Sequence, residues 1–249
     1  HFPTWVAPEW EEVFDDITGG PDFDQTDRSL WERLYTVDDR KIYEVKMGLK
    51  KKLFKYIRKR LQTDMMEKHV SPRSLLNISN HLNEKALTIG FARRFATYKR
   101  ATLLFRDINR LEKIVNNPDK PVQFIFAGKA HPHDGGGQDL IRRIFEISQM
   151  PKFEGKIIFL ENYDIELAKY LVRGVDIWLN TPTRPLEASG TSGEKGVMNG
   201  TIHFSVLDGW WVEGYRAFAG WALPKKRTFN NQNLQDDIDA ETIYNMLEY

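Results

Sequence analysis

Apolar residues recur at helical spacing in the first third of the chain. Between residues 40 and 62 they stand three and four positions apart, at Ile42, Val45, Leu49, Leu53, Ile57 and Leu61. This spacing predicts an amphipathic helix. The other face of the helix is basic and carries Lys46, Lys50, Lys51, Lys52, Lys55, Arg58, Lys59 and Arg60. A surface for nucleic acid or another polyanion is one interpretation, but a solvated helix face is the commoner source of such a charge run, and we adopt it.

The pattern changes after residue 84, where short apolar runs alternate with amphipathic stretches. The runs predict strands at 86–91, 122–128, 156–161 and 175–180, and the stretches between them predict helices at 98–115, 136–148 and 165–172. Nearly continuous apolar strands that alternate with helices indicate a parallel sheet covered on both faces. The sequence therefore predicts a doubly wound, Rossmann-like α/β fold.

This pattern also divides the chain. Residues 1–84 are expected to form an entry segment, including the basic helix, that packs on the same domain. Residues 85–249 form the Rossmann-like part, and their last stretch predicts a polar loop followed by a helix capped near Asp239.

Composition narrows the classes of function. The 249 residues carry 36 Lys and Arg against 35 Asp and Glu, and a net charge of +1 gives no global field for nucleic acid or an anionic membrane. No apolar run approaches the roughly 18 residues of a membrane span, and the absence of cysteine fits a reducing compartment. We expect a cytoplasmic protein without nucleic-acid or membrane partners. Because the chain starts at His1, we expect it to be a piece of a longer protein.

Cations cluster where the first predicted strand ends. Arg93, Arg94, Lys99 and Arg100 fall within eight residues, and ligands of doubly wound sheets bind at the carboxyl ends of the strands. Four cations so close repel one another unless an anion lies among them, so the segment predicts a site for a multiply charged anion. Exposed arginines on a first helical turn are the alternative.

A turn of small residues follows the last predicted strand. It runs from Gly190 to Lys195 and leads into a helix start, where free backbone N–H groups can bind an anion such as phosphate. The alternative is that Gly190 and Gly193 make a tight turn and that Thr191 or Ser192 caps the helix.

A glycine-rich loop after the second predicted strand holds His131, His133 and Asp134. These residues lack the further ligands that a divalent ion needs, so we predict no metal site there. A loop that lines a sugar or anion cleft is the preferred interpretation.

The stretch EASGTSGEKGVMNG, residues 187–200, resembles the cofactor-lysine segment of the α-glucan (glycogen, starch and maltodextrin) phosphorylases. The matching positions are Glu187, Ala188, Ser189, Gly190, Thr191, Lys195, Asn199 and Gly200. The later stretch LDGWWVEGY, residues 207–215, is similar to the shorter bacterial and archaeal branch of that family. Glu194 departs from the family pattern, which has Met or another apolar residue there.

The resemblance implies roles for individual residues. Lys195 would bear pyridoxal phosphate, and Arg93 stands in the place of a lysine that touches the cofactor phosphate. The other cofactor-binding positions would be Tyr163, Thr191, Ser192, Gly193 and Trp5. Arg94 and Lys99 match the catalytic pair that holds substrate phosphate. Sugar hydroxyls would be held by Glu187, Ser189 and Gly190.

The same resemblance implies an enzyme that splits α-1,4-glucan or maltodextrin with inorganic phosphate to give glucose 1-phosphate with retained configuration. The chain would be the C-terminal half of a two-domain GT-B architecture, inactive without the missing N-terminal domain, and the full-length form could be a homodimer. Half of a sugar-nucleotide-dependent transferase, similar to glycogen or starch synthase, is an alternative. Such enzymes carry two Glu eight positions apart, but the position eight after Glu187 is Lys195. A non-catalytic α/β binding module is the third hypothesis.

Overall fold

A parallel β-sheet forms the centre of the structure. The computed structural model describes residues 2–20, 23–68, 82–224 and 229–249. Within these ranges the sheet has six strands: β1 (Leu87–Ala92), β2 (Val122–Ala127), β3 (Ile157–Leu160), β4 (Ile177–Asn180), β5 (Ile202–Val206) and β6 (Gly220–Leu223). Their order is β3-β2-β1-β4-β5-β6, and every pair is parallel. This is the order of a doubly wound dinucleotide-binding fold, so the predicted α/β class is confirmed.

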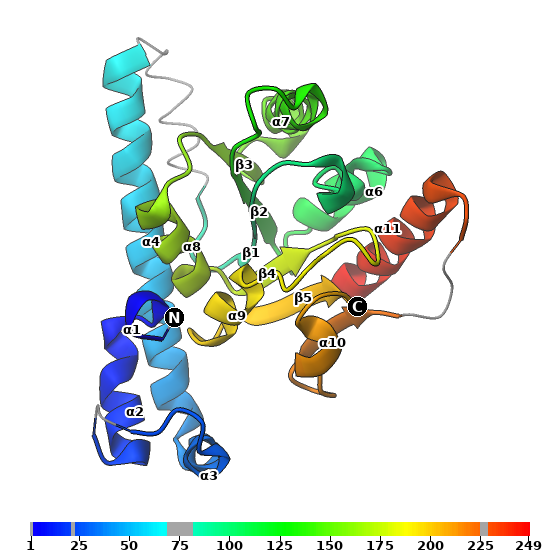
Figure 1. Cartoon of the computed structure of the whole chain (residues 1–249). Coiled ribbons are helices and arrows are strands. Elements are labelled where there is room, and N and C mark those ends of the chain that lie inside the picture. The colour runs from blue at the N-terminus through cyan, green and yellow to red at the C-terminus, as the bar shows by residue number, and fades with distance from the viewer. Residues whose placement is uncertain (1, 21–22, 69–81, 225–228) are drawn as a thin grey trace.

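Helices cover both faces of the sheet (Figure 1). On one face lie α6 (Ile108–Val115), α7 (Gly135–Ser148) and α11 (Gln232–Glu248), and on the other lie α4 (Asp39–Lys68) and α8 (Ile165–Gly174). Successive residues of a strand point to opposite faces. Accordingly, Phe124 and Phe126 enter the core beneath the first set, while Ile125 enters the core beneath α4 and α8. No helix in the described ranges is long and apolar enough to cross a membrane.

The chain order reverses between β1 and β4. Ile89 of β1 pairs with Phe124 of β2 on one side and with Ile177 of β4 on the other. Connections from these two strands leave toward opposite faces, which opens a crevice at their carboxyl ends. Short elements connect the strands and the longer helices: η3 (Thr97–Lys99), η4 (Leu103–Phe105), η5 (Pro151–Phe153), α9 (Ser192–Val197) and α10 (Trp211–Gly214).

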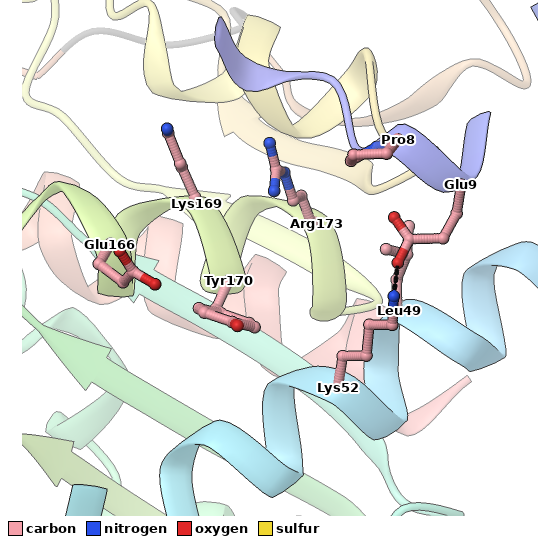
Figure 2. Close-up of a pocket in the computed structure, with 8 residues that line it drawn as sticks. All are labelled: Pro8, Glu9, Leu49, Lys52, Glu166, Lys169, Tyr170 and Arg173. Carbon is pink, nitrogen blue, oxygen red and sulfur yellow. Dashed lines mark hydrogen bonds and ion pairs between the residues drawn. The ribbon is translucent and has the colours of Figure 1, made fainter. Parts of the chain in front are cut away.

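The part of the entry segment that precedes α4 packs against α4 and α8. It contains α1 (Phe2–Trp5), η1 (Pro8–Trp10), α2 (Glu11–Thr18), α3 (Arg28–Glu32) and η2 (Arg33–Thr36). A groove of about 610 Å³ lies where η1 meets α4 and α8. Figure 2 shows its lining residues, with Glu9 paired to Lys52. On the α8 side, Arg173 donates from Nε to Trp5 O at 3.0 Å and from Nη2 to Val6 O at 3.1 Å. Hydrogen bonds from the Arg173 side chain to the backbone therefore hold residues 5 and 6 against α8, in addition to packing.

The helix predicted over 98–115 is confirmed for residues 108–115, which form α6, and is wrong for residues 98–107. Arg100 adopts a φ of 49°, in the left-handed region, and an α-helix cannot continue through that conformation. The regular helix starts only at Ile108, where the side chain of Asp107 accepts from Arg110 N at 2.9 Å and caps it. The turn at Arg100 brings Lys99 and Arg100 back to the sheet edge, which a continuous helix would not do.

The last helix begins earlier than predicted. α11 starts at Gln232, and its N-cap is Asn231, whose side chain accepts from Leu234 N at 3.3 Å. Asp239 lies inside the helix, where its carboxylate is 2.7 Å from Nη1 of Arg100. The predicted cap at Asp239 is therefore wrong, because this carboxylate pairs with a distant cation rather than with a helix start. β5 and β6 were not predicted from the sequence.

The basic face of α4 is solvated only in part. Lys51, Lys52, Lys55 and Lys59 are exposed, but Lys50 is 3% exposed. Its Nζ donates to Ala86 O at 2.8 Å and pairs with Asp176 Oδ2 at 2.6 Å. This buried pair joins α4 to the starts of β1 and β4. The adopted interpretation of a solvated face is wrong for Lys50.

We predict that Lys50→Ala destabilises the fold by about 3 kcal/mol, because it leaves the partly buried carboxylate of Asp176 without its cation. Urea unfolding monitored by far-ultraviolet circular dichroism measures the loss. Lys51→Ala is the matched control, because Lys51 is the next residue on the same helix and is exposed. Equal losses in the two variants would show that the pair contributes nothing.

Candidate functional site

A buried carboxylate with two cations lies at the crevice between β1 and β4. Arg93 follows β1 directly, and Glu187 comes from the loop after β4. Arg93 Nη2 is 2.7 Å from Glu187 Oε2, and Lys99 Nζ is 2.6 Å from Glu187 Oε1. Arg93 Nη1 also donates to Asn180 Oδ1, at the end of β4, at 3.0 Å. The side chain of Glu187 is 8% exposed. The structure thus brings together a predicted cofactor residue, a predicted catalytic residue and a predicted sugar ligand.

The protein itself supplies the anions for three of the four clustered cations. Glu187 pairs with Arg93 and Lys99, while Arg100 pairs with Asp239 and with Asp236 at 3.0 Å. The argument that the cluster needs an external anion is therefore wrong for these three. Arg94 is exposed and has no hydrogen bond or ion pair within the described ranges. It is the cation of this segment that can bind an anion without losing a contact.

The turn from Gly190 to Lys195 lies beside this cluster. Gly190 has a φ of 75°, a conformation that favours glycine. Thr191 occupies the N-cap position of α9, but its side chain makes no capping hydrogen bond, and Ser192 Oγ instead accepts from Trp178 Nε1 at 3.2 Å. The capping alternative is therefore wrong. Within the described chain the backbone N–H groups of Thr191, Ser192 and Glu194 have no hydrogen-bond partner. α9 spans six residues, so these donors, more than a helix dipole, make the turn suitable for an anion.

Lys195 projects from α9 toward the entry segment. Its Nζ lies 4.1 Å from the centroid of the Trp5 ring. Burial lowers the pKa of Lys195, and the neighbouring carboxylate of Glu194 opposes this shift. A lysine with a lowered pKa carries more free amine near neutral pH, and the free amine is the form that condenses with a carbonyl group. Glu194, the departure from the family pattern, thus acts against that activation.

Comparison with known proteins identifies the family. A family model described as "Carbohydrate phosphorylase" matches residues 25–219. The chain belongs to the carbohydrate phosphorylases. This confirms the resemblance seen in residues 187–200.

Three relatives are phosphorylases by name. A glycogen phosphorylase of Aquifex aeolicus is 44% identical over 249 residues, which cover the whole chain and 36% of that protein. A maltodextrin phosphorylase of Thermococcus litoralis is 44% identical over 250 residues, again the whole chain, and 29% of that protein is covered. A glycogen phosphorylase of Mycobacterium bovis is 39% identical over 99% of the chain and 28% of its own length. The chain thus spans about a third of the length of these relatives.

The remaining predicted residues of this phosphorylase chain lie around the same crevice or border it. Tyr163 is partly buried; burial raises the pKa of its hydroxyl to about 12, and the charge of Arg93 opposes that shift. Ser189 is exposed and its carbonyl accepts from Trp210 N at 2.9 Å. In the glycine loop, Asp134 caps α7 by accepting from Gly137 N at 2.9 Å. The described residues contain no group of three or more side chains that could hold a metal ion.

His203 lies beneath the turn and was missed by sequence analysis. It belongs to β5, is fully buried, and neither of its ring nitrogens has a partner in the described structure. A Cβ on Gly193 would lie 2.4 Å from His203 Cε1, so position 193 must be glycine for the turn to rest on this ring. Trp211 packs edge-on against the imidazole, with ring centroids 4.7 Å apart. The signal available in the sequence was a histidine within a short apolar stretch, residues 202–206, but this pattern does not indicate that the 190–195 turn packs on the imidazole.

Burial and the nearby charge of Arg93 lower the pKa of His203 to about 3 from 6.5. The unfolded chain then binds more protons than the folded chain between these values. The fold is therefore most stable, as far as His203 is concerned, above about pH 6.5, where the imidazole is neutral in both states. As the pH falls below this value, the free energy of unfolding decreases by up to about 1.4 kcal/mol per pH unit.

We therefore predict that His203→Gln makes the free energy of unfolding less dependent on pH between about pH 6 and 4. Denaturant unfolding at a series of pH values measures the slope. His131→Gln is the control, because His131 is exposed and its loss should leave the slope unchanged. A His203→Gln curve parallel to that of the parent would contradict a neutral, buried imidazole.

Proposed function

We propose that this chain forms the cofactor- and phosphate-binding part of an α-glucan phosphorylase. The complete enzyme would release glucose 1-phosphate from α-1,4-glucan or maltodextrin with inorganic phosphate and with retained configuration. The observation that carries the proposal is the position of Lys195, a lysine of lowered pKa at the end of a turn with unpaired N–H donors, which begins beside the carboxylate that pairs with the buried Arg93. Relatives named glycogen and maltodextrin phosphorylase that align with the whole chain support it.

The residues present fit pyridoxal phosphate. The amine of Lys195 would hold the cofactor covalently, and the ring of Trp5, 4.1 Å from that amine, provides an apolar wall. The unpaired N–H groups of Thr191, Ser192 and Glu194, and the Nε atom of Arg93, which is buried without a partner in the described structure, are donors suited to the cofactor phosphate. When bound, that phosphate would supply a group with a second pKa near 6, able to give and take a proton near neutral pH.

The cations of this chain would hold the substrate phosphate against the cofactor phosphate. Two unit charges about 5 Å apart repel by about 3 kcal/mol at an effective dielectric constant near 20. Arg94 and Lys99 would offset this repulsion. Lys99 already contacts both oxygens of Glu187, at 2.6 and 2.7 Å, so it would have to be shared between this carboxylate and the phosphate. Glu187 would thereby fix Lys99 while it accepts hydrogen bonds from the sugar, with Ser189 and Gly190 beside it.

The opposite wall of the cleft would come from the N-terminal part of the full-length enzyme, and we propose that the 249 residues alone do not catalyse the reaction. A cytoplasmic location and a homodimeric full-length form belong to the same proposal. A sugar-nucleotide transferase is disfavoured, because Lys195 stands where that class needs an acid and the relatives compared above are phosphorylases by name.

We predict that Lys195 carries pyridoxal phosphate in the full-length protein. Borohydride reduction converts the adduct into a stable secondary amine, which peptide mass mapping locates. Lys195→Ala should abolish both the adduct and phosphorolysis, whereas Lys169→Ala, at a lysine of similar partial exposure, should abolish neither. Turnover of a sugar nucleotide without an adduct at Lys195 would assign the protein to the transferases.

We also predict that Arg94→Ala and Lys99→Ala each raise the phosphate concentration for half-maximal phosphorolysis about 10- to 100-fold. Each change removes a charge-assisted contact to phosphate, worth roughly 1.5–3 kcal/mol. Initial rates at increasing phosphate concentration measure the effect, and Arg143→Ala, at an exposed arginine of α7, is the control. If both variants kept the phosphate dependence of the parent, the role proposed for this segment would be wrong.

A further inference from the structure

Asn199 connects the entry segment to the helix that carries Lys195. It follows α9 by two residues and is fully buried. Its side-chain oxygen accepts from Ala7 N at 2.8 Å. Its side-chain nitrogen donates to Trp5 O at 3.0 Å and to Lys195 O at 2.8 Å. One amide thus makes three hydrogen bonds, two to the backbone of Trp5 and Ala7 and one to the backbone carbonyl of Lys195.

These contacts determine where the Trp5 ring lies. Trp5 O accepts from both Asn199 and Arg173, and Asn199 Oδ1 holds the next turn at Ala7. The backbone on each side of Val6 is therefore attached to two different helices, α8 through Arg173 and α9 through Asn199. With the backbone held in this way, the indole ring lies 4.1 Å from the Nζ atom of Lys195.

We propose that Asn199 is a positioning residue that couples residues 2–7 to Lys195 by holding the Trp5 ring over the lysine amine. Its importance for catalysis rests on the proposed function, since that function makes Lys195 the cofactor lysine. The coupling itself does not depend on that function. Asn199 contacts no reacting atom and acts through Trp5 and through the backbone of Lys195.

The chemistry of the amide explains why asparagine is required. The site offers one N–H donor, from Ala7, and two carbonyl acceptors, from Trp5 and Lys195. An amide matches this set because it both accepts and donates. Aspartate has the same shape, but its second oxygen would face two carbonyl oxygens without a proton to share, which is costly for a buried group. Alanine would leave Ala7 N and Lys195 O without this partner, and Trp5 O would keep only its hydrogen bond from Arg173.

Release of the entry segment should change the environment of Lys195. Burial is the main cause of its lowered pKa, and the charged group that opposes the shift is Glu194, on the same helix. Asn199→Ala leaves Glu194 in place, so a change in titration would come either from the loss of cover by Trp5 or from a shift of the Lys195 backbone, and a double-mutant cycle with Trp5→Ala separates the two causes. We expect Lys195 to titrate at a higher pH in Asn199→Ala and, at pH 7, to react with pyridoxal phosphate about 3- to 10-fold more slowly than in the parent.

Lysine-labelled nuclear magnetic resonance titration of the 249-residue chain measures this directly and needs no cofactor. The set comprises the parent, Asn199→Ala, Asn199→Asp and a matched control, Asn116→Asp. The amide of Asn116 also donates to two carbonyls, Glu112 O at 3.0 Å and Lys152 O at 2.9 Å, but at the surface and on another helix. The control should leave the Lys195 titration unchanged. Thermal unfolding of every variant separates a local change from loss of the fold.

A double-mutant cycle with Trp5→Ala tests whether Asn199 acts through the ring. If it does, Asn199→Ala changes the titration of Lys195 in the parent but has little further effect when Trp5 is already alanine. Equal effects in both backgrounds, or an unchanged titration in a folded Asn199→Ala chain, would overturn the proposal. Should Asn199→Asp fail to fold, the alanine variants complete the cycle. If the titrations behave as expected but full-length protein forms no adduct at Lys195, the proposed function is wrong while the coupling stands.

Discussion

The buried carboxylate of Glu187 is the interaction on which the site depends. A carboxylate removed from water is stable only when cations and donors surround it, and here Arg93 and Lys99 both lie within 2.7 Å. Arg93 extends from the end of β1, Lys99 from the turn that follows, and Glu187 from the loop after β4. Their mutual pairing holds that loop against β1 at the point where the chain order reverses. The positions of Ser189, Gly190 and the turn after them follow from this attachment.

The turn itself is shaped by what lies beneath it. The imidazole of His203 occupies the space that a side chain at position 193 would need. Because residue 193 is glycine, the backbone of α9 can approach β5 closely. This approach buries a histidine that has no hydrogen-bond partner, a cost of about 1–3 kcal/mol per unsatisfied group. Locally unfavourable arrangements of this kind cluster at functional sites, and this one lies beneath a turn with unpaired N–H groups.

Polar contacts over long sequence distances attach the first 68 residues to this site. Lys50 binds Asp176, which also accepts from Thr88 N at 2.8 Å, so α4 is fixed to the strands that flank the crevice. Lys46 Nζ donates to Thr201 Oγ1 at 2.6 Å, just after Asn199, and burial lowers the pKa of this lysine to about 7. Two lysines of the basic helix α4 thus make contacts inside the fold that attach the helix to the site, although the sequence predicted a solvated face. The exposed lysines further along α4 remain solvated.

Local pattern in the sequence was sufficient for the fold class and for the family. Apolar periodicity marked α4 and the first four strands, because burial of one face or of a whole strand leaves a regular trace in sequence. The segment around Lys195 identified the family, because its turn is built from consecutive residues. Partners far apart in the chain left no such trace. Asp236 and Asp239 neutralise Arg100 from more than 130 residues away, and this contact bends the chain where periodicity predicted a helix. The tertiary structure decided three further points: that Lys50 is buried, that Arg93 is paired with a carboxylate of the protein, and that the ring of His203 lies under Gly193. Each of them depends on which groups, distant in the sequence, are buried together in a region of low dielectric constant.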